Sequence, residues 1–263
     1  MSPGEVAALV PGVGAVLSVE RIKHGLTNES WLVRTRNDAL VVRMSNTSES
    51  SLQIHRASET LILPAVARAG IGPEVLLCDP SRHLLVTRYL GPTWTAADSV
   101  RSDNILRIAA LLRRLHALAP PPGVHTVDFK AAVERYLVTL DEHDRRSAAG
   151  GAALWAKACD VAEMLQEDSR RCLFHNDVHA MNIVNAGESG LRLIDWEYAG
   201  LGQPLFDLAS LCMYHRYDGE QRVQLLTAYD PASDRMSVRR LELACWLLGY
   251  VRDLWTAVRE TTQ

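Results

Sequence analysis

The chain has 263 residues, of which 48% are apolar, 28 are lysine or arginine and 31 are aspartate or glutamate. This length suits one large domain or two modest lobes, and the formal net charge of -3 argues against nucleic-acid binding, which needs a concentrated positive field. The apolar stretches are too short to span a bilayer and no signal peptide is evident, so we expect a cytoplasmic protein without a membrane partner. The five cysteines are scattered and never form a Cys-x-x-Cys pair, which favours reduced thiols over disulfides or a zinc ribbon.

The beginning of the chain predicts a short helix and three strands. Ser2-Pro3-Gly4-Glu5 has the spacing of a helix capping box, with proline at the first helical position, and predicts a helix through Val10. Three short segments rich in β-branched residues follow, with the tight turn Asn37-Asp38 between the last two. These expected strands are Ala15–Lys23, Ser30–Arg36 and Ala39–Met44.

The next segment predicts a helix followed by two strands. Apolar residues recur at helical spacing over Leu52–Ala69, but Pro64 lies inside this segment and should kink or split the helix. Strands are expected over Glu74–Cys78 and His83–Tyr89, on either side of the turn Asp79-Pro80-Ser81. The first ninety residues would therefore hold five strands and one long helix.

From Gly91 onward the pattern is mostly helical. Helices are predicted over Asp103–Leu118, Asp128–His143, Ala152–Gln166, Pro204–Met213 and near Val238–Arg259. Short strand-like pieces interrupt them at Cys172–Phe174, Ile183–Val184 and Leu191–Ile194. The prediction is an α+β chain with a small antiparallel β lobe over residues 1–90 and a larger, mainly helical lobe over residues 91–263. Ligands favour the cleft between two such lobes.

The segments that carry chemistry are Phe174–Asn182 and Leu193–Glu197. Asp177, Asn182 and Asp195 lie on loops bounded by short apolar strands, so we expect them to converge. Phosphoryl transfer from a metal-bound nucleotide needs two carboxylates and an amide of this kind. One carboxylate orients the attacking hydroxyl and accepts its proton, while an amide oxygen and a second carboxylate hold Mg²⁺ against the phosphates.

The pattern His-x-Asp-x-x-x-x-Asn followed by Ile-Asp-Trp-Glu-Tyr-Ala-Gly resembles the catalytic and metal loops of the aminoglycoside phosphotransferase and choline kinase superfamily. Asp177–Ala180 and Leu193–Gly200 are especially similar to the choline/ethanolamine kinase-like and thiamine kinase-like branches. The resemblance implies a bilobal protein kinase-like fold, with an N-terminal nucleotide-binding lobe and a C-terminal catalytic and acceptor-binding lobe. It also implies ATP and Mg²⁺ as cofactors, Asp177 as the catalytic residue, and Asn182 and Asp195 as metal ligands.

The resemblance also assigns nucleotide contacts in the first lobe. Gly25, Leu26, Thr27 and Asn28 are similar to the phosphate-covering turn of choline kinases, although such a sequence is also an ordinary hairpin turn. Arg43 stands where protein kinases keep a lysine, with Glu59 as its expected partner; a strand arginine and a solvated helix face are the plainer interpretations. Arg88, Tyr89 and Leu90 would form the hinge whose backbone meets the adenine.

Other residues of the second lobe have two interpretations each. By resemblance Glu197 assists a second metal ion, and otherwise it is a surface acid. Choline kinases bind a quaternary ammonium in an aromatic box by cation–π attraction, which makes Trp246, Tyr250 and Trp255 candidate acceptor residues, although helical aromatics are more often part of a core. Asp207 resembles an aspartate of the family that braces the catalytic loop.

The function that these residues favour is an ATP- and Mg²⁺-dependent kinase that phosphorylates a hydroxyl of a small cationic alcohol, with choline or ethanolamine ahead of thiamine. Alternatives are a thiamine kinase, an aminoglycoside O-phosphotransferase and a nucleotide-binding pseudokinase. A metallohydrolase using His175 and His179 is disfavoured, because Asn176 follows the first histidine where a zincin has glutamate and no third ligand is evident. The sequence leaves the acceptor, the choice between ATP and GTP, and the oligomeric state open.

Overall fold

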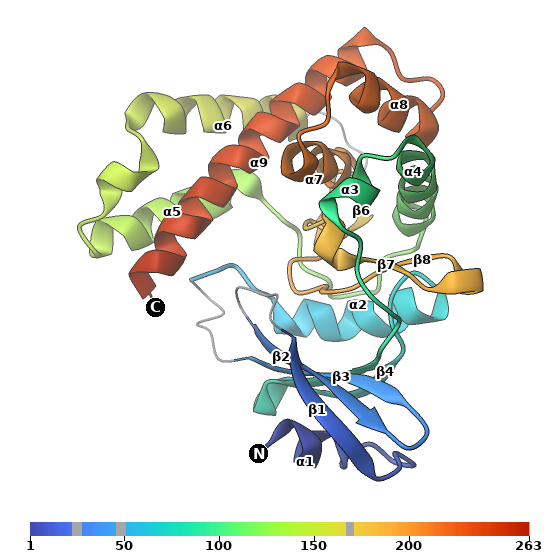
Figure 1. The fold of residues 1–263 in the computed structure, drawn as a ribbon. Helices are drawn as coiled ribbons and strands as arrows, with labels where there is room; N and C mark the ends of the chain where they lie inside the picture. Colours follow the sequence, from blue (N-terminus) through green and yellow to red (C-terminus); the bar gives the residue numbers. More distant parts are fainter. Residues whose placement is uncertain (23–27, 46–50, 167–170, 263) are drawn as a thin grey trace.

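The computed structural model describes residues 1–22, 28–45, 51–166 and 171–262. A five-stranded sheet forms the N-terminal lobe and helices form most of the C-terminal lobe, as Figure 1 shows. The strands lie in the order β1-β2-β3-β5-β4, and all neighbours in the sheet are antiparallel. Their bounds are β1 Val16–Ile22, β2 Asn28–Thr35, β3 Ala39–Ser45, β4 Val75–Asp79 and β5 Leu84–Arg88. The predicted fold class and the five antiparallel strands are thereby confirmed.

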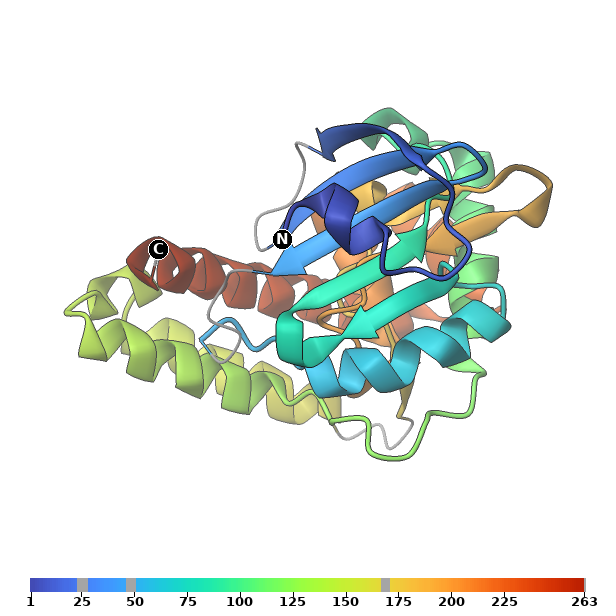
Figure 2. The ribbon, with the colours of Figure 1, turned by 90° about the horizontal axis from the view of Figure 1, so that it is seen from below.

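Two helices flank this sheet. Helix α1, Pro3–Ala7, starts with the predicted capping box between Ser2 and Glu5 and packs across the outer face of the sheet (Figure 2). Helix α2, Arg56–Arg68, runs through Pro64 as one helix and does not split there. A proline inside a helix costs roughly 3 kcal/mol, and the complete burial of Ile62, Leu63 and Val66 on the same helix outweighs this cost.

The helical lobe contains the predicted helices and three elements that the sequence analysis did not identify. The unpredicted elements are α3 Ala96–Ser99, α8 Gly219–Tyr229 and β9 Gly200–Gly202. The other helices are α4 Ser102–His116, α5 Phe129–Glu142, α6 Ala152–Gln166, α7 Leu205–His215 and α9 Arg235–Thr262. The short strands are β6 Cys172–Phe174, β7 Ile183–Asn185 and β8 Leu191–Leu193, and the 3-10 turns are η1 Pro80–Arg82, η2 Arg146–Ala149, η3 Ala180–Asn182 and η4 Gly187–Ser189. No helix in the described part of the chain combines the length and apolar character that a bilayer crossing requires.

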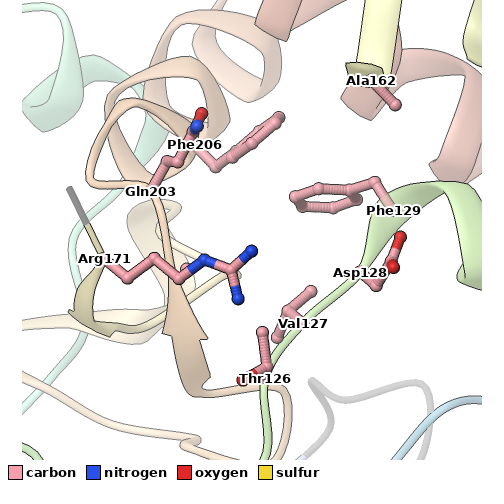
Figure 3. A pocket seen from close by; sticks show the side chains of 9 residues that line it. Thr126, Val127, Asp128, Phe129, Ala162, Arg171, Gln203 and Phe206 are labelled. Carbon is pink, nitrogen blue, oxygen red and sulfur yellow. The ribbon is translucent and has the colours of Figure 1, made fainter. Parts of the chain in front are cut away.

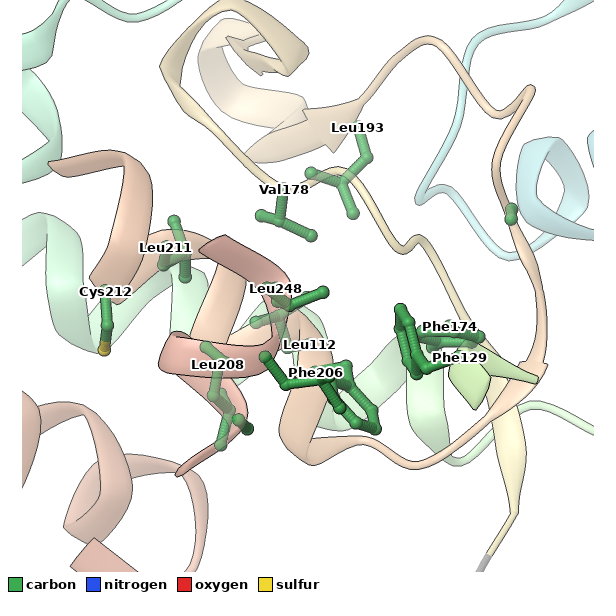
Figure 4. Packing of buried hydrophobic residues seen from close by; sticks show 14 of the residues in the cluster. Leu112, Phe129, Phe174, Val178, Leu193, Phe206, Leu208, Leu211, Cys212 and Leu248 are labelled. Carbon is green, nitrogen blue, oxygen red and sulfur yellow. The ribbon is translucent and has the colours of Figure 1, made fainter. Parts of the chain in front are cut away.

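The apolar core does not divide at residue 90. A small cluster lies between α1 and the sheet, where Val6 and Val10 contact β-strand residues such as Val42. The buried face of α2 belongs instead to the large cluster of the helical lobe. Figure 4 shows part of that large cluster, in which Phe129, Phe174 and Phe206 pack with leucines of α4, α7 and α9.

A substitution at Gly202 would test how closely the chain packs around Phe174, at the start of the segment Phe174–Asn182. A Cβ atom at this position would lie 2.5 Å from the ring of Phe174, which is completely buried. Because that ring has no room to move, we expect Gly202→Ala to lower the free energy of unfolding by about 1–3 kcal/mol in urea denaturation. Gly219→Ala is the matched control: nothing lies within 4 Å of its Cβ position, and alanine favours helix α8. Equal stability of the two variants would contradict this account.

Candidate active site

Two hairpin-like pairings bring the predicted catalytic and metal segments together. Strand β6 pairs with β9, and β7 pairs with β8, so the loop after β6 and the loop after β8 become neighbours. The Ile194 amide donates to the Asn182 carbonyl at 3.0 Å, and His175 Nε2 lies 2.9 Å from the Ile194 carbonyl oxygen. Asp195 follows directly after this junction, beside Asn182.

The backbone is strained at both loops. Asn176 and Asp195 each have φ of 64°, in the left-handed region that residues other than glycine rarely adopt. Asp207 at the start of α7 holds the first of these loops, because its carboxylate accepts hydrogen bonds from the amides of His175 at 2.9 Å and Asn176 at 2.7 Å. His116 contacts the same carboxylate at 3.0 Å. Such strain persists where the surroundings enforce it, and it is common at active sites.

Asp177 and Asn182 form a contact pair at the centre of the site. Asn182 Nδ2 donates to Asp177 Oδ2 and to the Asp177 carbonyl, both at 2.9 Å, which leaves the amide oxygen Oδ1 as the side-chain atom suited to a cation. His179 Nε2 lies 3.4 Å from Asp177 Oδ2. Burial tends to raise the pKa of Asp177, but the hydrogen bond and charge of His179, with help from the Tyr214 hydroxyl, hold that pKa below its usual range. Asp177 is therefore ionised at neutral pH.

Asp195 has the opposite electrostatic environment. Partial burial and the neighbouring carboxylates, Glu197 foremost, raise the pKa of Asp195 to about 8, although Arg43 lies 3.4 Å from its Oδ1. The Asp177 carboxylate also contributes to this shift. A carboxylate so destabilised by its neighbours favours binding of a cation.

The donor set fits Mg²⁺ rather than a protein-enclosed metal. Among the described residues, no three histidine, cysteine, aspartate or glutamate side chains converge on one point. The available oxygens are the carboxylate of Asp195 and the amide oxygen of Asn182. Mg²⁺ is commonly held by one or two protein oxygens, with substrate phosphates and water completing its shell.

Arg43 and Glu59 form the expected ion pair on the nucleotide side. The guanidinium binds the carboxylate through two bonds of 2.7 and 2.6 Å, and both side chains are buried. Burial opposes the charge on Arg43, but Glu59 outweighs this effect and raises the pKa of Arg43. Arg56 also contacts Glu59, at 2.9 Å, and Glu197, at 3.0 Å; the sequence analysis did not identify Arg56.

Of the four residues predicted to form the phosphate-covering turn, the structure describes only Asn28. Gly25, Leu26 and Thr27 lie outside the described residues. Asn28 begins β2 and donates to Glu197 Oε2 at 2.7 Å, which connects β2 to the loop after β8.

In the predicted hinge, the amide groups of Arg88 and Tyr89 donate to the Glu74 and Ala39 carbonyls, each at 2.9 Å. The Arg88 side chain forms ion pairs with Asp38 and Glu74. The amides of Arg88 and Tyr89 therefore already donate within the sheet. An adenine would have to bind the Leu90 backbone or the carbonyl groups of Arg88 and Tyr89.

The three candidate acceptor aromatics do not share one location. Trp246 stacks on Tyr250 with ring centroids 6.0 Å apart, and the Lys157 ammonium of α6 already lies 4.0 Å from the Trp246 ring centroid. The Tyr250 hydroxyl donates to the Ala149 carbonyl of η2. Trp255 instead donates to the hydroxyl of Tyr198 at 3.0 Å.

Tyr198 connects Trp255 to the site. Its carbonyl accepts from Asn176 Nδ2 at 3.3 Å, and burial together with the Glu197 and Asp177 charges raises the pKa of its hydroxyl. The Tyr214 hydroxyl bonds to Asp177, and the Tyr214 ring centroid lies 4.9 Å from that of His179. Sequence reasoning identified neither tyrosine, although Tyr198 lies inside the motif that was recognised. Tyr198 and Tyr214 thus both lie near Asp177.

A separate cavity lies behind the catalytic segment. It has a volume of about 70 Å³, and Figure 3 shows the Arg171 side chain extending toward the rings of Phe129 and Phe206. None of the predicted site residues lines it. We assign no catalytic role to this cavity.

The model of one protein family covers most of the chain. Residues 18–239 match the model of the phosphotransferase enzyme family. The chain belongs to that family. The resemblance noted in the sequence is confirmed, and the protein is a phosphotransferase.

The individual relatives of this phosphotransferase include a thiamine kinase and a choline kinase. Protein LicA of Haemophilus influenzae is 25% identical over 251 residues, covering 90% of this chain and 72% of LicA. The thiamine kinase of Escherichia coli O9:H4 (strain HS) is 47% identical over 55 residues, which are 21% of this chain and 19% of that enzyme. The structure of choline kinase LicA from Streptococcus pneumoniae superposes with a TM-score of 0.77 at 21% identity, over 97% of this chain and 88% of that one. A LicA structure solved with AMP gives a TM-score of 0.73 at 20% identity, over 98% and 88%.

Proposed function

We propose that this phosphotransferase is an ATP- and Mg²⁺-dependent kinase whose acceptor is a small cationic alcohol, with choline or ethanolamine ahead of thiamine. The observation that carries the proposal is the contact of Asn182 with Asp177 at 2.9 Å, next to an Asp195 whose surroundings favour a cation. A base, an amide oxygen and a metal-binding carboxylate are the groups that phosphoryl transfer requires.

In the proposed reaction, the acceptor hydroxyl oxygen bonds to the γ-phosphorus while the bond from that phosphorus to the β,γ-bridging oxygen breaks, leaving ADP. Asp177 orients the hydroxyl and receives its proton. Asn182 and Asp195 would hold Mg²⁺, which neutralises charge on the phosphates when it is bound. Arg43, kept in place by Glu59, and the turn at Gly25–Asn28 would steady the phosphates, and the backbone at Arg88–Leu90 would meet the adenine.

Two observations favour a cationic acceptor. The Tyr214 hydroxyl bonds to Asp177. The Tyr198 carbonyl accepts from Asn176, which precedes Asp177, and the Tyr198 hydroxyl accepts from Trp255. Aromatic faces attract ammonium groups through cation–π interaction. Residues 91–263 also carry four more acidic than basic side chains, which is a small excess for a polycationic aminoglycoside and sufficient for a singly charged alcohol. Thiamine is the second candidate, because of the short match to thiamine kinase at 47% identity.

An acceptor panel tests the proposal. We expect ADP release with ATP and Mg²⁺ to require choline or ethanolamine, with weaker or no release for thiamine, kanamycin and streptomycin, and EDTA to abolish it. Mass spectrometry should find a phosphate ester of the acceptor. ADP release that no acceptor stimulates would refute the acceptor class, and a clear preference for thiamine or kanamycin would replace it with that alternative.

A further inference from the structure

Arg56 lies at the centre of a buried polar network between the lobes. Its guanidinium contacts Glu59 Oε2 at 2.9 Å, Glu197 Oε2 at 3.0 Å, Asn28 Oδ1 at 2.9 Å and Ser45 Oγ at 3.0 Å. Its side chain is only 9% exposed. These partners come from α2, from β2 and β3 of the sheet, and from the loop after β8. One side chain therefore joins three consecutive elements of the N-terminal lobe to a loop that is distant in the sequence.

The network attaches the metal loop to the nucleotide lobe through two arginines, in addition to the hydrogen bond of 2.7 Å from Asn28 to Glu197. Arg43 lies 3.4 Å from Asp195, and Arg56 lies 3.0 Å from Glu197. Glu59 contacts both arginines and keeps them side by side. The two acids of the loop differ in exposure, since the Asp195 side chain is 35% exposed and that of Glu197 is 2% exposed. Asp195 is thus open to a ligand, whereas Glu197 is enclosed by protein.

The chemistry of these contacts requires arginine. A buried guanidinium is tolerated where several acceptors surround it, and its planar fork can donate to four partners in fixed directions. A lysine ammonium has three donors on a flexible stem and could not reproduce this arrangement. Between Asp195 and Glu197, Trp196 is buried and donates to the Leu193 carbonyl, so the short segment from Asp195 to Glu197 has little freedom.

We propose that Arg56 is a positioning residue that anchors Glu197 to the nucleotide lobe and thereby fixes Asp195 in the orientation that binds the divalent cation–nucleotide complex. Glu197 is then an anchor for the loop and not itself a metal ligand. Arg56 touches neither substrate, and it acts through Glu197. This inference rests on the proposed kinase function, because it concerns the same nucleotide and metal site.

The test is the factor by which Mg²⁺ increases ADP affinity, measured by calorimetry with Mg²⁺ and with EDTA, on the full chain without acceptor. We expect Arg56→Gln to reduce this factor by about tenfold or more, since a buried partner is removed. Glu197→Gln should reduce it similarly, and the double variant should lose no more than the worse single variant, because the two residues act as one unit. Arg21→Gln is the control: this arginine forms an exposed pair with Glu29 in the same lobe, and the factor should stay unchanged.

Three results would overturn the inference. Arg56→Gln could lower the melting temperature and keep the Mg²⁺ factor, in which case Arg56 supports only the fold. The two single losses could add, in which case the residues act independently. An ADP affinity of the wild-type protein that does not change with Mg²⁺ would also exclude the inference. If Arg56→Gln does not fold, Arg56→Lys takes its place, because it keeps the charge and loses the fork. Failure of the acceptor panel alone would refute the proposed acceptor and leave this binding measurement intact.

Discussion

Asp177→Asn is expected to lower kcat by about 10²- to 10⁴-fold with the acceptor that the wild type prefers, because the carboxamide cannot receive the hydroxyl proton. The KM for ATP should change little, since Asp177 is assigned no contact with the nucleotide. The fold should survive as well: the replacement has the same shape, and its oxygen can still accept from Asn182 Nδ2, which lies 2.9 Å from the native carboxylate. Initial rates, ADP affinity and the melting temperature together measure these three properties.

Asp103→Asn is the matched control for this substitution, because Asp103 is an exposed aspartate on α4 paired with Arg101. Its kcat should equal that of the wild type. A folded Asp177→Asn protein with a near-native transfer rate would remove Asp177 from the role of base. A variant that loses ADP affinity in parallel with kcat would instead place Asp177 in the nucleotide site.

The second large effect is expected at Asp207, which is completely buried. Its carboxylate accepts from the amides of His175 and Asn176 and contacts His116. In Asp207→Asn the side-chain NH₂ group would replace one carboxylate oxygen and face an N–H donor of the loop or of His116. At least one buried N–H group would then lose its acceptor. We expect the free energy of unfolding to fall by about 3 kcal/mol or more, measured by urea denaturation.

Activity should fall with this stability, because the strained residue Asn176 directly precedes Asp177. The kcat measured on the folded fraction should therefore decrease even where the protein is fully native. Asp218→Asn provides the control, since Asp218 caps α8 and asparagine caps helices about as well as aspartate. Native stability of Asp207→Asn would show that the catalytic loop holds its conformation without this brace.

Much of the site could be predicted because its residues are close together in the sequence. Asp177 and Asn182 lie five positions apart, and the short strands around them fix how they meet. The pairing of Arg43 with Glu59 was expected from the resemblance to the strand–helix ion pair of kinases. The sequence could not show that Arg56 is buried: an arginine three residues before a glutamate is typical of an exposed helix surface. Its partners on β2 and on the loop after β8 depend on tertiary structure.

The acceptor aromatics show a different kind of limit. Trp246 and Tyr250 are four residues apart on α9 and share one face, separated by about 40° around the helix axis. Trp255 lies five residues further and is rotated by about 140° from Tyr250. One flat site could not use all three, and the structure accordingly places Trp246 and Tyr250 near α6 and η2 while Trp255 reaches Tyr198.

Helix α8 was missed although Asp218 and Gln221 have capping-box spacing.

The apolar contacts of α2 determine how this enzyme could be recombined with its relatives. Ile62, Leu63 and Val66 of α2 pack into the core of the helical lobe. A chimera joined at residue 90 would therefore place the α2 of a relative against the helical core of this protein, and the side chains of the two would not fit each other. A transplant limited to α1 and strands β1–β3 would keep that packing intact, because β4 and β5 also contribute side chains to the large core. Exchange of nucleotide preference between family members should therefore succeed when α2 stays with the recipient.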